Sequence, residues 1–241
     1  MKLGSISLRP GMTGTFFYER AFQLLGIEGT YKALKCNNVD EIRVIAESGQ
    51  YSGLSISMPF KSQVMILCSD VDSSTFNGES VNTIKFTSDG RIVGYNTDQS
   101  GVDVAVSHLA PGKSSILGSG SMAKCFAREL EKRGLEYEMY SRKLGNWDER
   151  TRNTSNLINC TPIGMDGISV PVSDLSGIAT IVDLPIASSE FRKRAKAAGV
   201  EYFSGLEFYG FVFLKQLNIY TGKEITRTEL EEIKKEWNLH A

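Results

Sequence analysis

Apolar residues recur at helical spacing in two segments near the start of the chain. We predict one helix over residues 15–25, ended by Gly26, because glycine readily adopts the left-handed backbone that follows a helix. A second helix is predicted over residues 38–48, where Asn38 can cap the first turn and Glu41 stands three residues further on.

Alternating and β-branched residues predict three strands in the next segment. Gly53–Lys61 alternates, with Met58 as its last apolar position, and therefore predicts a strand that presents the amine of Lys61 at its tip. The runs 81–86 and 91–95 flank a Ser-Asp-Gly turn, which predicts a β-hairpin.

After residue 98 the pattern changes to alternating helices and strands. A helix is predicted over residues 98–109. The strand and helix segments that follow are 114–118, 123–133, 136–141, 155–160, 180–184, 191–198 and 201–203. This alternation is typical of a parallel sheet with crossover helices.

The chain ends in two predicted helices. A long apolar run over 206–220 predicts a buried helix, and Thr226 with Glu229 can form a capping box for the last one. The apolar face of that last helix comprises Leu230, Ile233 and Trp237.

Taken together, the elements predict an α/β fold with two domains. The chain has 241 residues, enough for two cores. One domain is expected to span 1–98 plus 206–241, and the other 99–205. A cleft between two such domains is the natural binding site for a small molecule.

Composition narrows the possible partners. Hydrophobic residues make up 41% of the chain, charged residues 23%, and the net charge is −1. Nothing therefore favours nucleic acid or an anionic membrane as a partner. The chain has no apolar run long enough for a bilayer and no signal-peptide core at its start, so we expect a cytoplasmic protein. Both a monomer and a homodimer are compatible with the sequence.

The cysteines and histidines do not predict a metal site. The four cysteines lie far apart and form no CxxC pair, so reduced thiols are expected. The two histidines, His108 and His240, are too few to form a cluster. His108 is either catalytic or, as we favour, a partly exposed helix residue.

A glycine-rich turn follows the strand that ends near residue 117. Gly118 permits the tight turn, Gly120 lets the backbone approach a pyrophosphate, and the small Ala123 lets helix and strand pack closely. Backbone N–H groups around Ser121, at the helix N-terminus, then face the phosphates. The strand before the turn and the helix after it favour dinucleotide binding over a merely structural turn.

The end of the next strand indicates which dinucleotide binds. An NAD site usually carries an acidic residue there, whereas this chain has Ser141, Arg142 and Lys143. A serine and two cations suit a 2′-phosphate, so we favour NADP over NAD. The alternative is that both cations are solvated loop residues.

Lys61 and Asp98 are candidates for proton transfer. Reduction of a ketone needs a proton donor at the oxygen, which an ammonium can be, and a carboxylate can orient it. On spacing alone, we favour the alternative of an ordinary exposed lysine and an Asp98 that caps a helix.

Five motifs in order resemble those of the shikimate dehydrogenase family, and they cover nearly the whole chain. They are Gly53-Leu-Ser-Ile-Ser-Met-Pro-Phe-Lys61, Ser80-Val-Asn-Thr83, Gly94-Tyr-Asn-Thr-Asp98, Gly118-Ser-Gly-Ser-Met-Ala123 and Asn159-Cys-Thr-Pro-Ile-Gly-Met165. The resemblance implies an N-terminal α/β substrate domain, a Rossmann-like NADP-binding domain, and a catalytic pair carried by Lys61 and Asp98.

The resemblance also assigns roles around the substrate and cofactor. It implies that Asn82 and Asn96 hydrogen-bond the hydroxyls of a cyclic polyol acid. It places Thr161 and the backbone near Gly164 and Met165 beside the nicotinamide.

The chain departs from the family pattern at substrate contacts. Ser7 is kept near the N-terminus, but Arg9 replaces the second serine of a carboxylate-binding Ser-x-Ser, as in the shikimate dehydrogenase-like subgroup. Arg9 either binds a carboxylate bidentately or lies on the surface. Ser57 keeps a hydroxyl where threonine is usual, and Val212 replaces a glutamine, with Gln216 one turn later.

Other positions also differ from the family. A tyrosine that is frequent near residue 184 is absent. The chain between Arg142 and Asn159 has room for little more than a loop and a strand, so we expect the usual crossover helix to be missing or truncated.

The resemblance leaves three functions open. We favour an NADP-dependent oxidoreductase that interconverts a ketone and a secondary alcohol on a small cyclic hydroxy-acid. The alternatives are a biosynthetic shikimate dehydrogenase of the aromatic amino acid pathway, and a homologue that binds a metabolite without chemistry.

Overall fold

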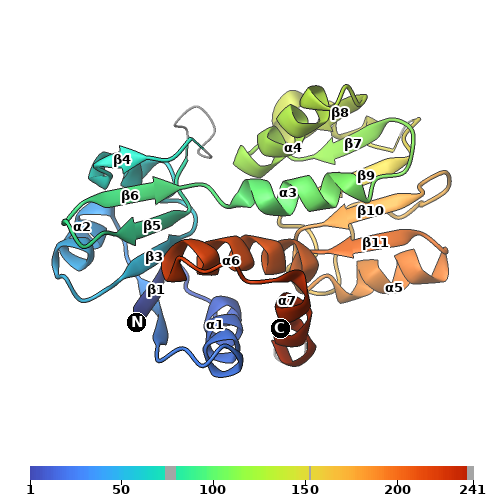
Figure 1. The fold of residues 1–241 in the computed structure, drawn as a ribbon. Coiled ribbons are helices and arrows are strands. Elements are labelled where there is room, and N and C mark those ends of the chain that lie inside the picture. Colours follow the sequence, from blue (N-terminus) through green and yellow to red (C-terminus); the bar gives the residue numbers. More distant parts are fainter. Residues whose placement is uncertain (74–79, 152, 238–241) are drawn as a thin grey trace. The chain divides into compact units, whose positions relative to one another are not determined.

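The computed structural model describes residues 1–73, 80–151 and 153–237 (Figure 1). The chain forms two compact units. Unit 1 comprises Met1–Asp98 and Val212–Ala241, and unit 2 comprises Gln99–Phe211. The division falls inside one long helix, α6 (Gly205–Thr221), six residues after the boundary expected from the sequence. His240 lies outside the described residues, as does the side chain of Trp237.

Unit 1 is built on a mixed six-stranded sheet. In spatial order its strands are β2 (Thr30–Lys35), β1 (Lys2–Ser7), β3 (Gly53–Ile56), β5 (Thr83–Phe86), β6 (Ile92–Tyr95) and β4 (Asp70–Val71). β1 runs parallel to β2 and β3, whereas β5 runs antiparallel to β3 and β6. The predicted hairpin is confirmed as the β5–β6 pair, which Gly90 closes with a positive φ of 81°.

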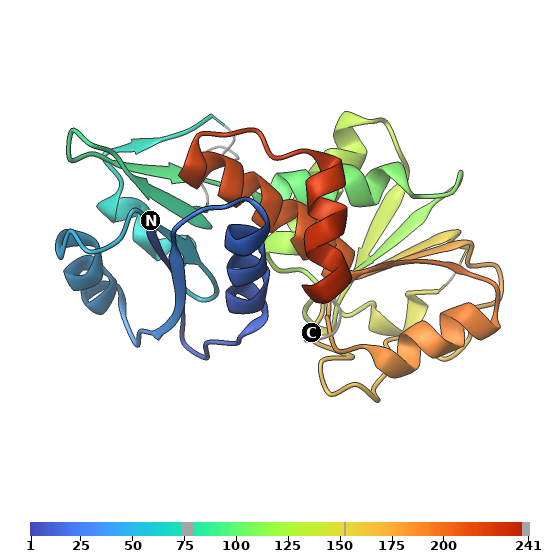
Figure 2. The same ribbon diagram turned by 60° about the horizontal axis from the view of Figure 1, so that its bottom comes forward.

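The helices of unit 1 begin and end close to the predicted residues. They are α1 (Thr13–Leu24), α2 (Val39–Glu47), the 3₁₀ turn η1 (Gln63–Leu67), the second half of α6, and α7 (Arg227–Trp237). α1 packs beside α7 (Figure 2). The predicted Asn38 cap is confirmed, since its side chain accepts from the Glu41 amide at 2.9 Å. The Thr226–Glu229 capping box is confirmed in both directions.

The strand predicted over residues 53–61 is shorter than expected. β3 ends at Ile56 and Met58 is 67% exposed, so the predicted end of the strand at Lys61 was wrong. All four residues of β3 are buried, because this central strand is covered on both faces. Pro59 has no N–H with which to extend the ladder, and Lys61 lies on the turn after the strand.

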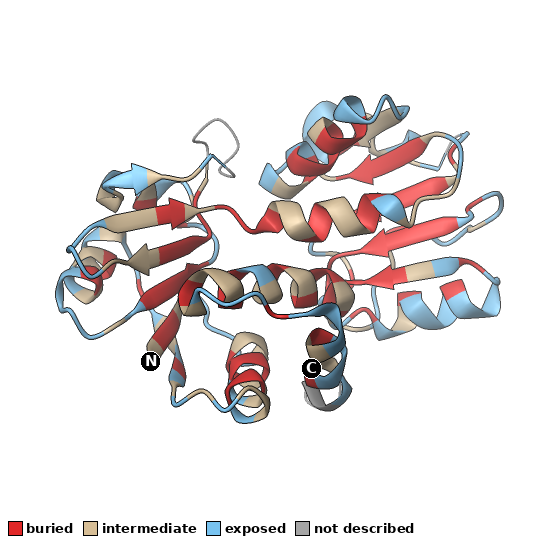
Figure 3. Cartoon of the chain, in the orientation of Figure 1, coloured by how far each residue is buried: buried red, intermediate tan, exposed pale blue. Residues whose placement is uncertain are grey.

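Unit 2 carries a fully parallel five-stranded sheet. In spatial order its strands are β11 (Glu201–Ser204), β10 (Thr180–Asp183), β9 (Asn156–Asn159), β7 (Ser114–Leu117) and β8 (Tyr137–Tyr140). Every residue of β7, β9 and β10 is buried (Figure 3). The chain passes from β7 to β8 on one side and then returns to β9 on the other side of β7. Such a switch in strand order is where doubly wound sheets bind ligands.

The helices of unit 2 confirm the predicted α/β alternation. They are α3 (Asp98–Ser107, whose first residue belongs to unit 1), α4 (Ser121–Lys132), α5 (Ser189–Ala197) and the first half of α6. Between β8 and β9 the described residues contain only the 3₁₀ turns η3 (Arg142–Leu144) and η4 (Trp147–Glu149). The predicted loss of a crossover helix is therefore confirmed for this part of the chain. Within the described ranges, none of the helices is both long and apolar enough to span a bilayer.

Candidate active site

Several of the predicted polar residues lie together along one side of the unit 1 sheet, at the ends of its central strands. β1 and β3 are parallel, with Ile6 opposite Ile56, so Ser7 and Ser57 leave neighbouring strands at the same edge. The backbone N–H of Ser57 donates to the Ile6 carbonyl at 2.9 Å, which holds the two strand ends together. Both hydroxyls therefore lie at the carboxyl ends of central strands.

Both predicted asparagines lie at this same edge. Because β5 is antiparallel to β3, the residue before β5, Asn82, lies beside the end of β3, and its carbonyl accepts from the Ile56 amide at 2.7 Å. Asn96 directly follows β6, whose last residue, Tyr95, accepts from the Asn82 amide at 3.0 Å. Sheet topology thus brings together residues that are far apart in sequence.

Lys61 and Asp98 form an ion pair. The distance from Lys61 Nζ to Asp98 Oδ2 is 2.5 Å, and the side chains are 18% and 5% exposed. Asp98 is the first residue of α3, and its other carboxylate oxygen accepts from the Asn82 amide nitrogen at 2.9 Å. The result is a partly accessible amine beside a buried, anchored carboxylate.

The two asparagines make internal contacts that the sequence did not indicate. The side-chain oxygen of Asn82 accepts from the Thr83 hydroxyl at 2.8 Å and from the Thr97 amide at 2.9 Å. Asn96 donates to the Ser80 hydroxyl at 3.0 Å and accepts from the Asp98 amide at 3.0 Å. Both side chains therefore help to hold the strand ends and the start of α3 in place.

The N-terminal loop carries the exposed Arg9. Ser7 is half-buried, whereas Arg9 and Ser57 are both exposed. Within the described part of the chain, no ion pair or hydrogen bond engages the Arg9 guanidinium. Its five donors are thus available to an anion.

Unit 2 contains a cavity of about 420 Å³ at the carboxyl edge of its sheet. It is lined by the loops that follow β7, β8 and β9, namely residues 118–120, 141–143 with Trp147, and 160–163. These loops flank the switch in strand order, so the cavity occupies the position at which a doubly wound sheet binds a nucleotide.

The turn after β7 fits a pyrophosphate. Gly118 has a positive φ of 112°, and a Cβ there would stand 3.4 Å from the Cys160 carbonyl oxygen. Gly120 is the N-cap of α4, so no side chain caps the first amides of this helix. A Cβ at Gly120 would have no neighbouring atom within 4 Å. Ser121 is exposed in the first turn, and Ala123 is fully buried behind it. Free N–H groups at an open helix terminus suit a phosphate anion.

The loop after β8 presents two cations to the cavity. Arg142 and Lys143 are exposed, and both line it. Ser141 also lines it, and its hydroxyl oxygen accepts from the Leu144 amide at 3.1 Å, which caps η3. The serine therefore fixes the turn that carries the two cations.

The loop after β9 is shaped by Asn159. Its side-chain oxygen accepts from the Thr161 hydroxyl at 2.6 Å, and its amide nitrogen donates to the Ile163 carbonyl at 3.0 Å. Thr161 lines the cavity. Gly164 is buried at a φ of 106°, where a Cβ would collide with the Ser188 hydroxyl, and Met165 is 66% exposed.

A buried carboxylate, not singled out by the sequence analysis, holds this loop. Asp183, at the end of β10, has no exposed surface and accepts from Asn159 Nδ2 at 2.6 Å and from the Tyr202 hydroxyl at 2.5 Å. Burial raises the pKa of Asp183 above its ordinary value, although these hydrogen bonds oppose the shift. An aspartate at the end of a buried parallel strand was the available signal.

His108 directly follows α3, and all four cysteines are free thiols. His108 Nδ1 lies 2.9 Å from the Val104 carbonyl oxygen, and the ring packs on Phe203, so helix contacts account for it. Burial raises the pKa of the Cys160 thiol far above its ordinary value, which keeps it protonated. The residues that the structure describes include no group of His, Cys, Asp or Glu that could hold a metal ion.

Comparison with known proteins agrees with this geometry. A model of the shikimate dehydrogenase substrate binding domain matches residues 11–84. Shikimate dehydrogenase (NADP(+)) of Streptococcus pneumoniae is 25% identical, with 89% of each chain covered. The shikimate dehydrogenase-like protein of Haemophilus influenzae is 27% identical, covering 90% of this chain and 89% of that protein. The chain is thus similar to shikimate dehydrogenases and to a shikimate dehydrogenase-like protein over most of its length.

A solved structure of this family has the same fold. Shikimate 5-dehydrogenase from Thermus thermophilus, in complex with NADP(H) and shikimate, superposes with a TM-score of 0.82. The identity is 21%, and 98% of this chain and 99% of that chain are covered. At that identity the likeness establishes the fold.

Gln216, one turn after Val212, does not stand in for the glutamine that shikimate dehydrogenases usually carry at the position of Val212. Val212 is 2% exposed and apolar. Gln216 is buried, accepts from the Tyr18 hydroxyl at 2.9 Å and from the Ser55 hydroxyl at 3.0 Å, and donates to Thr83 at 2.9 Å. Gln216 thus bonds only to the protein interior among the described residues, and so cross-links α1, β3 and β5.

Three tyrosines surround this buried glutamine. Tyr18 stacks on Tyr31 with ring centroids 4.1 Å apart, and the Tyr220 hydroxyl lies 3.0 Å from the Ser55 hydroxyl. Burial raises the pKa of Tyr31 to about 12 and those of Tyr18 and Tyr220 well above the ordinary value. All three remain neutral at any physiological pH and serve as hydrogen-bonding groups.

Proposed function

We propose that this chain is an NADP-dependent oxidoreductase that interconverts a ketone and a secondary alcohol on a small cyclic hydroxy-acid. Shikimate and 3-dehydroshikimate, or a close analogue, are the proposed pair. The observation that carries this proposal is the Lys61–Asp98 ion pair, at the sheet edge that also presents Ser7 and Ser57. The names of the relatives support the same chemistry.

The residues that line the unit 2 cavity suit NADP. The open N-terminus of α4 holds the pyrophosphate, while Arg142 and Lys143 pair with the 2′-phosphate. When bound, NADP supplies or accepts the hydride. Thr161 lies on the loop that Asn159 shapes, and this loop forms the nicotinamide side of the cavity.

Lys61 moves the proton. Its ammonium donates to the ketone oxygen during reduction, and the amine takes the hydroxyl proton in the reverse direction. Asp98 orients the amine, and Asn82 fixes Asp98 through the bond to its second oxygen. A positioned general acid of this kind contributes roughly 10²–10⁴ to the rate.

The substrate carboxylate is assigned to the N-terminal loop. Arg9 is exposed and unpaired among the described residues, and a guanidinium binds a carboxylate through two parallel hydrogen bonds. Ser7 lies two residues before it. Asn82 and Asn96 are proposed to contact ring hydroxyls through their remaining amide hydrogens.

The proposal is tested by NADP⁺ reduction with the purified protein, using shikimate and quinate in parallel. Turnover of about 1–10³ per second on shikimate would identify a biosynthetic shikimate dehydrogenase. Slow turnover on shikimate with faster turnover on quinate would point to a pocket re-specified by Arg9 and Val212. Absence of turnover on both substrates, with NADPH still bound, would contradict the proposed substrate class.

One observation favours a second candidate, a metabolite-binding homologue without chemistry. The described residues between β8 and β9 form only two 3₁₀ turns, which leaves fewer residues to hold the cofactor. A pure metabolite binder would not change NADPH fluorescence, whereas the proposed enzyme shifts it on binding.

A further inference from the structure

We infer that the indole of Trp147 is the surface against which the adenine ring of NADP lies. This inference deepens the proposed function and rests on its cofactor assignment. Among the residues that line the unit 2 cavity, all of them in the described part of the chain, Trp147 is the only aromatic one.

The position of Trp147 matches the adenine end of the cofactor. It begins η4, on the same loop after β8 that carries Arg142 and Lys143. The 2′-phosphate and the adenine are attached to the same ribose. When the 2′-phosphate binds Arg142 and Lys143, the adenine therefore lies close to the neighbouring lining residue of the cavity. Trp147 supplies that wall.

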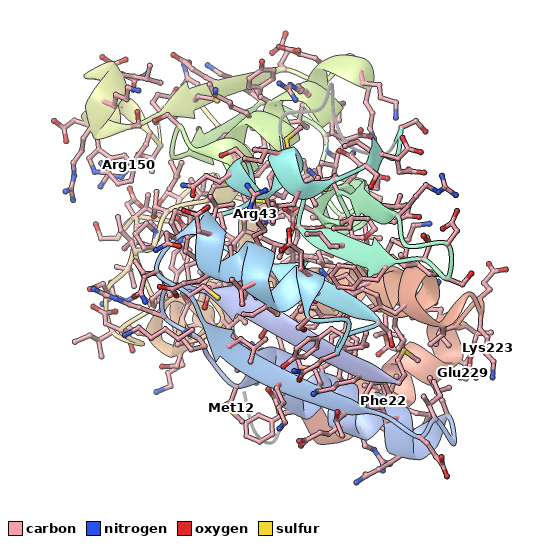
Figure 4. All side chains as sticks on the ribbon, turned by 90° about the vertical axis from the view of Figure 1, so that its left-hand side faces the viewer. Met12, Phe22, Arg43, Arg150, Lys223 and Glu229 are labelled. Atoms are coloured by element: carbon pink, nitrogen blue, oxygen red, sulfur yellow. The ribbon has the colours of Figure 1, made fainter. Side chains whose placement is uncertain are left out.

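The Trp147 ring is held in place before any ligand binds. The Arg150 guanidinium, labelled in Figure 4, lies over it with its carbon 4.6 Å from the ring centroid. Arg150 also donates to the Trp147 carbonyl at 2.8 Å and to the Pro171 carbonyl at 2.9 Å. The indole packs in addition against the buried cluster that contains Tyr140 and Val172. A ring fixed in advance loses little conformational entropy on binding.

A rigid aromatic wall also explains how a shortened loop can hold a nucleotide. The segment between β8 and β9 has only two 3₁₀ turns among its described residues, so it offers few groups to enclose the base. Stacking against an aromatic side chain is strong for every base and needs no hydrogen-bond partner. Truncation of such a side chain weakens base binding by roughly ten- to a hundredfold.

The experiment uses the full chain and two ligands, NADPH and adenosine 2′,5′-bisphosphate, which has no nicotinamide. The chain has two tryptophans, so W237F leaves Trp147 as the sole indole reporter. We expect both ligands to quench the Trp147 emission of W237F. We also expect W147L to bind both ligands about ten- to a hundredfold more weakly, and W147F to recover most of the affinity.

The outcomes separate this inference from the proposed function. If NADPH binds W147L as tightly as it binds the wild type, the inference is overturned and the cofactor assignment stands. If W147L does not fold, unchanged Trp147 emission of W237F at saturating bisphosphate overturns the inference by itself. If the wild type binds neither ligand, the cofactor assignment fails and the inference falls with it.

Discussion

Lys61 and Asp98 differ in how they are held. Asp98 is almost fully buried and bonded through both oxygens, to Lys61 and to Asn82, whereas the lysine side chain is 18% exposed and has this carboxylate as its partner. The carboxylate is therefore the fixed end of the pair, and the amine is the end that can reach a substrate. This asymmetry suits a proton carrier held by a stationary anchor.

Replacing Lys61 with alanine removes the proposed proton donor. We expect K61A to lose roughly 10²–10⁴ in turnover, because the ketone oxygen then has no positioned acid. NADPH affinity should change by less than about twofold, since the Rossmann-like unit keeps all of its proposed contacts. Steady-state kinetics and NADPH fluorescence titration check the two expectations separately. Wild-type turnover by K61A would rule out this residue as the donor.

Arg142 provides a second test at the residue scale. R142A should weaken NADPH binding by about tenfold or more, because a charge-assisted bond to the 2′-phosphate is lost. NADH lacks that phosphate and should bind the variant almost as it binds the wild type. Titration of both nucleotides against R142A measures the difference, with the exposed Lys193 on α5 as a matched control in K193A. Equal losses for the two nucleotides would contradict the 2′-phosphate assignment.

Some residue roles follow from sequence and others do not. The pairing of Lys61 with Asp98 followed from the resemblance of the ordered motifs to the shikimate dehydrogenase family, since the spacing of the two residues alone did not indicate it. Gln216 has partners 161 and 198 positions away, Ser55 and Tyr18, and no local pattern marks such contacts. Val212, one turn earlier, was singled out only because it replaces a glutamine that is usual in shikimate dehydrogenases.

At the scale of elements, Asp183 joins two strands of unit 2 to one loop. It ends β10 and bonds Asn159 at the end of β9, and Asn159 shapes the loop that lines the cavity. We propose that Asp183 is a positioning residue that acts through Asn159. Burial raises the pKa of Asp183, because the charged carboxylate loses hydration in the protein interior.

The pH dependence of stability reports on this carboxyl. A raised pKa in the folded state means that the native protein binds the proton more tightly, so the contribution of Asp183 to stability falls as pH rises from about 4 through the folded pKa. D183N does not titrate and keeps an oxygen for Asn159. We expect its free energy of unfolding, relative to the wild type, to increase from pH 4 to pH 7 in urea unfolding.

The control for this test is D183A, which removes the acceptor together with the charge. It should bind NADPH more weakly than D183N, because the loop after β9 loses its anchor. If the difference in free energy of unfolding between D183N and the wild type did not change with pH, the pKa of Asp183 would not be raised in the folded state.

The elements most faithfully predicted are those with local signals. The Asn38 cap, the Thr226 capping box and the hairpin around Gly90 each depend on residues within a few positions of one another. The end of β3 was predicted at Lys61 instead of Ile56, because alternation in sequence continues to Met58, beyond the last ladder residue. Neighbouring strands decide where a ladder ends, and they come from distant parts of the chain.

At the scale of the whole molecule, unit 1 depends on both ends of the chain. Residues 212–241 contribute buried apolar side chains to it, including Leu217, Leu230 and Ile233. Each such side chain contributes about 1.5–3 kcal/mol by burial, and a domain is stable by only about 5–15 kcal/mol in total. Unit 1 should therefore not be stable without its C-terminal part.

A chain that ends at Phe211 tests this dependence. We expect unit 1 to become sensitive to protease, with the loss of any response to shikimate, while unit 2 still binds NADPH because all of its residues are present. Limited proteolysis should leave a protected fragment that begins near residue 99. Comparable protection of residues 1–98 in this truncated chain would contradict the expectation.

Because unit 1 consists of two separate stretches of the chain, the two units are expected to fold at different times during synthesis. Chains emerge at about 5–20 residues per second, and a domain folds once all of its residues are available. Residues 1–98 emerge first, yet unit 1 is complete only when residues 212–241 have emerged as well. Unit 2 is complete earlier and is continuous in sequence. The nucleotide-binding half is thus expected to fold first, and the half that carries Lys61 and Asp98 only once residues 212–241 have also emerged.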